Sequence, residues 1–172
     1  MVERAQVLIG AELTSWRLVL LPVTLELADA ILAGDFSGLS ERGLKRTAGW
    51  PRGDTLEIMS FILIMKETAG PCWLVARRND GVIIGDLGCK GQPGEDGEVE
   101  IGYGIVAGEQ GKGYGTEVVQ TVVHWLSEQP KVQTITAECL RGNEASIRVL
   151  EKVGMQRRKT EGNMLYWRLA CG

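Results

Sequence analysis

The sequence has few residues of the types that bind metal ions. Its 172 residues contain one histidine, His124, and its four cysteines form no CxxC pair. Structural zinc sites usually need four such ligands at close spacing, so we expect no metal site. We expect the cysteines to be free thiols of a protein from a reducing cytoplasm. They are Cys72, Cys89, Cys139 and Cys171.

Long apolar runs and an excess of positive charge are also missing. No apolar stretch reaches the roughly 18 residues that span a membrane, and the apolar patch within 1–16 is too short and too interrupted by charge for a signal peptide. The formal net charge is −3, which implies no general affinity for nucleic acid. We expect a cytoplasmic monomer or homodimer without nucleic-acid or membrane partners.

No repeat, low-complexity tract or linker divides the chain, so we expect one domain over residues 1–172. Apolar patterning and turn residues predict helices that interleave with strands. This order implies a mixed α/β sheet, partly parallel and partly antiparallel, with about six to seven strands and about four flanking helices. Strands are expected at 15–24, 72–80, 81–91, 98–107 and 132–140, with two short strands within 155–170. Helices are expected at 25–34, 54–70 (amphipathic), 113–129 and 143–154, and a loop or broken helix at 35–53.

Residues 108–116, GEQGKGYGT, contain four glycines between an expected strand and an expected helix. A P-loop requires Ser or Thr after Gly-Lys, but Gly111-Lys112 is followed by Gly113. A dinucleotide-binding fingerprint requires a third glycine where Thr116 stands. The turn therefore matches neither of these nucleotide-binding patterns.

The physical properties of this turn nevertheless favour an anion. Glycines let backbone N–H groups approach a ligand closely, and the following helix leaves its first N–H groups unpaired at a partly positive end. Together these features form a cradle for a phosphate or a pyrophosphate. The structural alternative is a turn that only connects two elements.

The segment Gln110-Gly-Lys-Gly113-Tyr-Gly115 resembles the Q/R-x-x-G-x-G/A signature of the GNAT superfamily of acetyl-CoA-dependent N-acetyltransferases. Three blocks in the usual order resemble its RimJ/RimL-like branch. RLVLLPVT is similar to the first strand, EIGYGIVAGEQGKGYGTE to the fourth strand and pyrophosphate loop, and NEASIRVLEKVGM to the N-x-x-S helix and the following strand. The resemblance covers most of 14–170, is weakest over 35–70, and implies one GNAT-type domain with a CoA-binding core at about 98–154.

The resemblance implies which residues bind CoA. Backbone groups of Ile105, Val106 and Ala107 are expected to pair with the pantetheine arm, and Asn143 to contact this arm while capping its helix. The pyrophosphate is expected on backbone N–H groups of the glycine turn, with Lys112 either adding charge or lying solvated at the surface. The turn residues are Gln110, Gly111, Lys112, Gly113, Tyr114, Gly115 and Thr116.

The resemblance also implies catalytic groups for direct attack of an amine on acetyl-CoA in a ternary complex. A backbone N–H at the end of the 98–107 strand would stabilise the oxyanion, and Ser146 would assist the leaving thiolate, although a serine in a first helical turn can also be structural. Glu100 and Glu138 are candidate bases that would act through a water molecule, and Glu100 is preferred. The structural alternative is that both are partly exposed strand residues without a catalytic role. His124 lies off the apolar stripe of its helix and is expected at the surface.

The sequence leaves the acceptor amine open. At pH 7, neutralising an α-amino group of pKa ~8 costs about 1.4 kcal/mol, whereas a lysine of pKa ~10.4 costs about 4.6 kcal/mol. A water-mediated base therefore favours a protein N-terminal α-amine, which agrees with the RimJ/RimL-like resemblance. If the protein is an acetyltransferase, the alternative acceptors are small amines such as polyamines, amino acids or antibiotics. If it is not an enzyme, the alternative is a non-catalytic acyl-CoA-binding module.

Overall fold

The computed structural model describes residues 7–172, so the parts of the signal-peptide and single-domain predictions that concern residues 1–6 lie outside it. Within this range, nine strands form one mixed sheet with the order β1-β2-β4-β5-β6-β7-β9-β8, and β3 pairs with β5. The strands are β1 Leu13–Thr14, β2 Leu18–Pro22, β3 Lys45–Arg46, β4 Cys72–Arg77, β5 Val82–Cys89, β6 Glu98–Ile105, β7 Thr134–Leu140, β8 Gln156–Glu161 and β9 Met164–Ala170. The helices are α1 Leu25–Leu32, α2 Ser37–Glu41, α3 Gly53–Met65, α4 Tyr114–Ser127 and α5 Glu144–Lys152.

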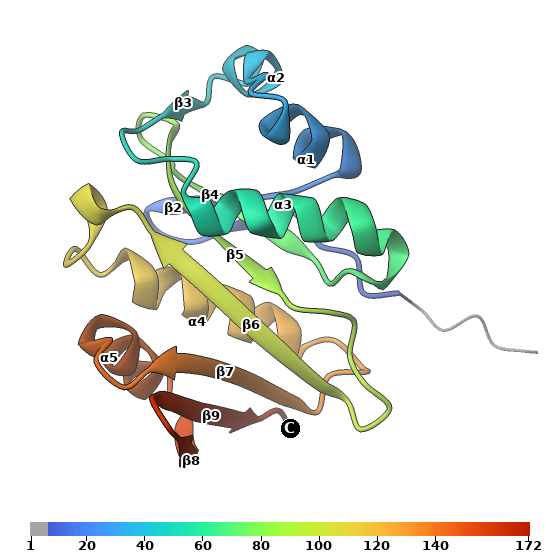
Figure 1. Ribbon diagram of the computed structural model, residues 1–172, viewed down its shortest axis with the longest axis vertical. Helices are drawn as coiled ribbons and strands as arrows, with labels where there is room; N and C mark the ends of the chain where they lie inside the picture. The colour runs from blue at the N-terminus through green and yellow to red at the C-terminus, as the bar shows by residue number, and fades with distance from the viewer. Residues whose placement is uncertain (1–6) are drawn as a thin grey trace, which may run out of the picture.

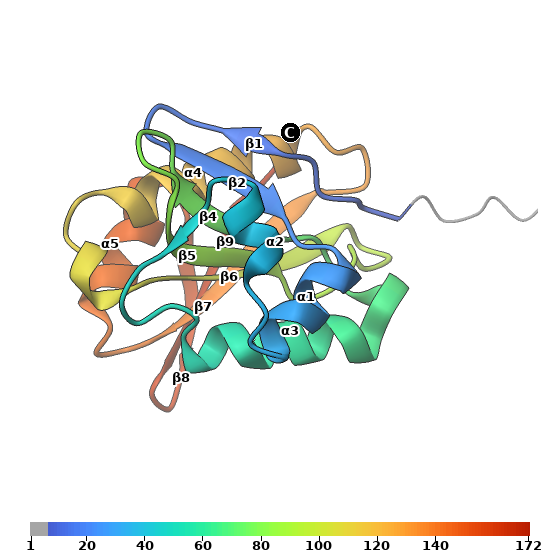
Figure 2. The same ribbon diagram turned by 90° about the horizontal axis from the view of Figure 1, so that it is seen from above.

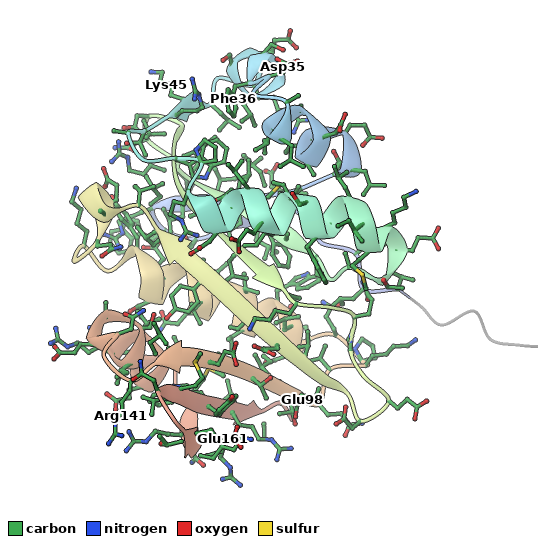
Figure 3. The ribbon with its side chains drawn as sticks, viewed as in Figure 1. Asp35, Phe36, Lys45, Glu98, Arg141 and Glu161 are labelled. Atoms are coloured by element: carbon green, nitrogen blue, oxygen red, sulfur yellow. The ribbon has the colours of Figure 1, made fainter. Side chains whose placement is uncertain are left out.

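The predicted mixed α/β class is confirmed, with a few more elements than expected. The additional strands, β1 and β3, are two residues long. The additional helix, α2, and strand β3 both lie in the segment 35–53, which was expected to be a loop or a broken helix. In this segment the Phe36 ring packs edge-on against Trp50, with 6.1 Å between ring centroids, and Arg46 lies 3.9 Å from the Phe36 centroid. Figure 3 places Asp35, Phe36 and Lys45 at the end of the molecule opposite Arg141 and Glu161.

Helices cover both faces of the sheet. The pair α1 and α3 pack against each other on one face, and α4 lies on the opposite face (Figures 1 and 2). The predicted apolar stripe of α4 is confirmed, because Val118, Val119, Val122 and Leu126 are fully buried and Val123 is half-buried. His124 lies off this stripe with a side chain that is 80% exposed, as expected for a surface residue.

Helix α3 differs from the predicted amphipathic helix over 54–70. It ends at Met65, and a 3₁₀ turn follows over Lys66–Thr68. Its C-cap is Lys66 rather than Gly70, and Gly70 instead allows a close approach to Gly91, whose carbonyl oxygen a Cβ at position 70 would meet. The helix is also apolar on several sides, so burial of Met59 and Ile62 leaves other apolar side chains in contact with solvent. These exposed residues are Leu56, Phe61, Ile64 and Met65.

Candidate active site

Strands β6 and β7 are paired only over their first halves. A parallel register joins Glu98–Ile101 to Thr134–Ala137, and the rest of β7 pairs with β9 alone. Strand β6 meanwhile stays paired with β5 as far as Ile105. The two strands therefore diverge toward α5 (Figure 1) and leave a gap in the middle of the sheet.

Backbone alternation decides which groups of β6 face this gap. The Lys90 N–H donates to the Glu100 carbonyl over 2.8 Å, so the even-numbered residues of β6 direct their backbone groups toward β5. Tyr103 and Ile105 therefore direct theirs toward the gap. The Ile105 carbonyl accepts a hydrogen bond from Gln110 Nε2 over 2.9 Å, which joins the end of β6 to the glycine turn.

The Val106 backbone is used inside the protein. Its N–H donates to the Ile84 carbonyl over 2.9 Å, and its carbonyl accepts from the Glu109 N–H over 3.0 Å. The side chain is buried as well. The expected backbone pairing of Val106 with a pantetheine arm therefore does not fit this geometry, and the backbone groups of Tyr103 and the N–H of Ile105, which face the gap, are better placed.

The glycine turn places the start of α4 beside the end of β6. Gly111 and Gly113 have φ angles of 75° and 83°, a region that other residues rarely adopt, and Gly113 is the N-cap of α4. Among residues 7–172, no backbone or side-chain acceptor pairs with the N–H groups of Tyr114, Gly115 and Thr116. The first turn of α4 therefore presents free donors and the positive end of its dipole.

A cavity of about 430 Å³, which we call the loop cavity, lies against this turn. Three cationic side chains border it: Arg52 before α3, and Arg148 and Lys152 of α5. Free N–H donors, glycines without a Cβ and nearby cations are the features that hold a pyrophosphate. Eight of the residues expected to bind CoA line this cavity, namely Ile105, Gln110, Gly111, Gly113, Tyr114, Gly115, Thr116 and Asn143.

Three expected residues lie outside the lining: Val106, Ala107 and Lys112. The Lys112 ammonium instead lies 3.0 Å from Glu109 Oε2, and Arg77 reaches the other oxygen of Glu109 at 2.8 Å. Hydrogen bonds from Lys112 and Arg77 lower the pKa of Glu109, although burial acts in the opposite direction. The positive charge of Lys112 is thus largely matched by this carboxylate.

A second cavity, of about 240 Å³, lies between the diverging strands and is called here the gap cavity. Tyr103, Asn143 and Ser146 line both it and the loop cavity, so the two cavities meet at these side chains. Asn143 Oδ1 accepts a hydrogen bond from the Ser146 N–H over 3.1 Å and so caps α5, as predicted. Burial raises the pKa of the Tyr103 hydroxyl to about 12, so this group is a neutral donor at physiological pH.

The two candidate bases share one lysine. The Lys90 ammonium pairs with Glu100 and lies 2.8 Å from Glu138 Oε1. Burial lowers the pKa of Lys90, but its hydrogen bonds to both carboxylates outweigh this effect and raise it above the usual value. Glu138 lines the gap cavity, whereas Glu100 does not. The geometry therefore favours Glu138 over the sequence-based preference for Glu100.

Sequence reasoning missed a buried ion pair beside the site. Arg52 Nη2 lies 2.9 Å from Oδ1 of Asp86, whose side chain is fully buried, and Thr55 Oγ1 donates to the other oxygen. Burial raises the pKa of Asp86, and the Arg52 charge opposes this shift. The guanidinium lies so close to Gly104 of β6 that a Cβ there would collide with it. The available signal was an aspartate inside the apolar run 82–89.

Two absences hold for the described part of the chain. Residues 7–172 contain no group of three or more His, Cys, Asp or Glu side chains that could hold a metal ion. None of their helices is long and apolar enough to cross a membrane.

Comparison with known proteins identifies the family. The model of the family described as "Acetyltransferase (GNAT) domain" matches residues 17–156. This chain belongs to the GNAT acetyltransferase family. The curated relative "Uncharacterized N-acetyltransferase YjdG" of Bacillus subtilis (strain 168) is 30% identical over 156 residues, which are 88% of this chain and 93% of the relative. The protein described here is accordingly an N-acetyltransferase that uses acetyl-CoA.

Solved structures show the same fold at lower identity. RimL, described as a ribosomal α-N-protein acetyltransferase in complex with coenzyme A, has a TM-score of 0.68 and 15% identity, covering 93% of this chain and 98% of RimL. MccE, described as a microcin C7 self-immunity acetyltransferase in complex with acetyl-CoA and AMP, has a TM-score of 0.64 and 15% identity, covering 91% and 93%. One of these structures is described as acting on a protein α-amine and the other as conferring self-immunity to microcin C7, so they do not decide the acceptor of this chain.

Proposed function

We propose that this GNAT enzyme transfers an acetyl group to a primary amine by direct attack within a ternary complex, and that the amine is a protein N-terminal α-amine. The observation that carries the proposal is the gap between β6 and β7. It opens beside the free N–H groups of α4 and joins the loop cavity to the gap cavity at Tyr103, Asn143 and Ser146. Acetyl-CoA and the amine that accepts the acetyl group can enter from opposite sides of the sheet and meet at this gap.

The residues of the loop cavity fit acetyl-CoA, which supplies an acetyl thioester. Backbone N–H groups of residues 111–116 hold its pyrophosphate, and Arg148 and Lys152 add positive charge. The backbone groups of Tyr103 and the N–H of Ile105, which face the gap, pair with the pantetheine arm. Asn143 lies where it contacts this arm while it caps α5.

Acetyl transfer then requires three groups of the protein. One hydrogen-bond donor must lie at the carbonyl oxygen of the thioester and another at its sulfur, and a proton acceptor must lie at the attacking amine. A backbone N–H of β6 that faces the gap stabilises the negative charge that develops on the carbonyl oxygen. The hydroxyls of Ser146 and Tyr103 line the junction of the cavities and donate toward the leaving sulfur. Glu138 accepts the amine proton through water, and Lys90 holds this carboxylate in place.

A weak base suits an acceptor that is easily neutralised. An α-amine of pKa ~8 is already partly neutral at pH 7, whereas a lysine side chain of pKa ~10.4 must first lose its proton at a cost of about 4.6 kcal/mol. The similarity to RimL, described as an α-N-protein acetyltransferase, is consistent with this choice. Small-molecule amines are the second candidate, supported by a further cavity of about 530 Å³ that Ile58 and Phe61 of α3 line.

An acceptor screen tests the proposal. The protein is incubated with acetyl-CoA and with peptides that have free N-termini, polyamines or aminoglycosides, and the release of the CoA thiol is measured. Thiol release with the peptides, together with an acetylated N-terminus by mass spectrometry, supports the proposal. Release with small amines alone would move the acceptor to the second class, and no release with any amine would favour a binding module.

A further inference from the structure

A third cavity, of about 530 Å³, lies on the α3 side of the sheet, and we call it the α3 cavity. Its wall is mainly apolar. Ile58, Phe61 and Ile62 of α3 form one side, and Cys72 and Cys89 form the floor. Burial raises the pKa of Cys89 to about 12 and that of Cys72 well above its usual value, so both thiols stay neutral and behave as small apolar groups.

The α3 cavity is continuous with the acetyl-transfer site. Lys90 and Gly102 line both it and the gap cavity, and Asp54 lines both it and the loop cavity. An acceptor in the α3 cavity therefore reaches the end of the acetyl-CoA site from the side opposite α4. Acetyl-CoA and the acceptor amine would therefore lie on opposite sides of the sheet and meet at the gap between β6 and β7.

The rim of the α3 cavity is acidic. Asp54 and Glu57 lie about one turn apart on α3 and border the cavity, and both are exposed. Asp54 is paired with Arg52 over 3.2 Å, so Glu57 carries the charge that most attracts an ammonium group. Phe61, one turn beyond Glu57, is 40% exposed, so an apolar surface remains open to solvent next to the carboxylates. An open apolar wall beside a few polar groups is typical of a small-ligand site.

We propose that the α3 cavity is the acceptor site and that it selects primary amines whose amino-bearing carbon carries an apolar group. The inference rests on the proposed acetyl-transfer function. The acceptor ammonium approaches along Asp54 and Glu57, and its apolar group packs against Ile58 and Phe61. A second ammonium on the part of the molecule that packs against Ile58 and Phe61 would lose its water without a partner on that wall, so polyamines are disfavoured.

A series of straight-chain primary amines from propylamine to hexylamine tests this selection, because these amines share nearly the same ammonium pKa. Each methylene that the cavity removes from water is expected to improve affinity by about two- to fourfold, so hexylamine should exceed propylamine about tenfold or more. Affinity is measured on the protein saturated with CoA, and kcat/KM with acetyl-CoA. Equal affinities across the series, or tighter binding of spermidine than of hexylamine, would overturn the proposal.

Two variants on the same helix provide the contrast. Phe61→Ala should reduce the hexylamine-to-propylamine ratio severalfold, because it removes part of the wall. Ile64→Ala is the matched control, since Ile64 is 77% exposed and does not line the cavity, and its ratio should equal that of the wild type. Phe61→Asp should reverse the preference toward 1,6-diaminohexane. A Phe61→Ala variant that changes only the oligomeric state, with an unchanged ratio, would overturn the proposal in favour of contact with a second copy.

Peptides distinguish a protein acceptor from a small amine. A peptide that starts with leucine should exceed one that starts with glycine by about tenfold or more if a peptide N-terminus enters the cavity. A preference confined to the alkylamines assigns the cavity to small apolar amines, and no preference in either set overturns the proposal. Absence of thiol release with every amine would defeat the proposed function, whereas the affinity series on the CoA complex would still decide whether the cavity selects apolar amines.

Discussion

The Tyr103 hydroxyl lies 3.5 Å from the carbonyl oxygen of Ser146, at the junction of the loop and gap cavities. This contact joins β6 to the first turn of α5 across the gap in the sheet. Both side chains carry a hydroxyl that remains protonated at neutral pH, because burial raises the pKa of Tyr103 to about 12 and serine hydroxyls do not titrate in this range. The Ser146 hydroxyl is therefore a neutral donor where the leaving sulfur is proposed to lie, and the Tyr103 hydroxyl becomes a second one when its single proton turns from the Ser146 carbonyl to the sulfur.

Removal of the Ser146 hydroxyl should slow the reaction modestly. We expect Ser146→Ala to lower kcat about tenfold to a hundredfold and to leave the Kd of acetyl-CoA nearly unchanged, because a thiol of pKa ~8.5 already yields a fair leaving group. Steady-state kinetics and a melting curve on the same preparation check this. A wild-type kcat in a less stable protein would assign Ser146 to helix stability alone.

Tyr103→Phe keeps the aromatic ring and removes only the hydroxyl. A pKa near 12 lies about 3.5 units above that of a thiol, so full proton transfer from Tyr103 to the sulfur is uphill. We therefore expect a loss in kcat of about tenfold from the missing hydrogen bond, and no activity change near pH 10 that depends on Tyr103. The pH–rate profiles of wild type and variant between pH 6 and 10 should be parallel, and a basic limb that disappears in the variant would contradict this.

A single charge in the glycine turn should weaken CoA binding. Gly111 lines the loop cavity, a Cβ there would meet nothing within 4 Å, and its φ of 75° is a conformation that Asn and Asp tolerate. Gly111→Asp places a negative charge near a pyrophosphate, and at about 6 Å from two negative charges in water the repulsion is about 1.4 kcal/mol, or tenfold in Kd.

Gly111→Asn is the matched control, because it has the same shape without the charge. Its Kd for CoA, measured by calorimetry at low salt, should remain close to that of wild type while Gly111→Asp weakens at least about tenfold. The difference should shrink as salt is added. Equal losses in both variants would show that shape, not charge, limits the site.

The elements that local sequence determines were predicted well. The β6–turn–α4 unit follows from the apolar run, the glycines and the stripe of Val118, Val122 and Leu126, and Asn143 caps α5 as its residue type indicates. The turn at Gly162, with a φ of 56°, separates β8 and β9, the two short strands that were expected within 155–170. Each of these features depends on neighbours within a few positions of the chain.

Features that depend on distant segments were missed. Strand β3 is two residues long and exists only because it pairs with β5. The contact between Arg52 and Asp86 requires α3 to lie across the sheet, and the bridge from Lys90 to Glu100 and Glu138 requires three strands to be in register. Nothing in the local pattern of these residues specifies such partners. The site residues implied by the family resemblance remain predictions.

Acid should weaken the attachment of α4 to the start of the sheet. Glu117, in the first turn of α4, accepts hydrogen bonds from the Ser15 hydroxyl at 2.6 Å and from Arg17 Nε at 2.7 Å. Burial raises the pKa of Glu117, but these bonds outweigh it and lower the pKa below the usual value. The stabilisation is therefore fully present above the unfolded pKa of ~4.3 and is lost as the pH falls through the lower folded value.

Glu117→Gln should consequently lower the free energy of unfolding by about 1.5–3 kcal/mol at pH 7, and the difference from wild type should shrink below about pH 4. Denaturant unfolding of wild type and variant at pH 7, 5 and 3.5 measures this difference in the free energy of unfolding. Glu144→Gln is the control, because Glu144 pairs with Arg148 on the surface and such pairs contribute little. A Glu117→Gln penalty that stays constant with pH would show that shape, and not charge, stabilises this contact.

Glu138 and Glu100 provide the sharpest test of the base, because both pair with Lys90 and have side chains of similar exposure, 34% and 35%. Only Glu138 lines the gap cavity. We expect Glu138→Gln to lower kcat at pH 7 by about a hundredfold, the lower end for a general base. Glu100→Gln removes one partner of Lys90 as well, so its smaller loss measures the cost of disturbing that pair. Equal losses in the two variants would assign the effect to Lys90, and a larger loss in Glu100→Gln would restore Glu100 as the base.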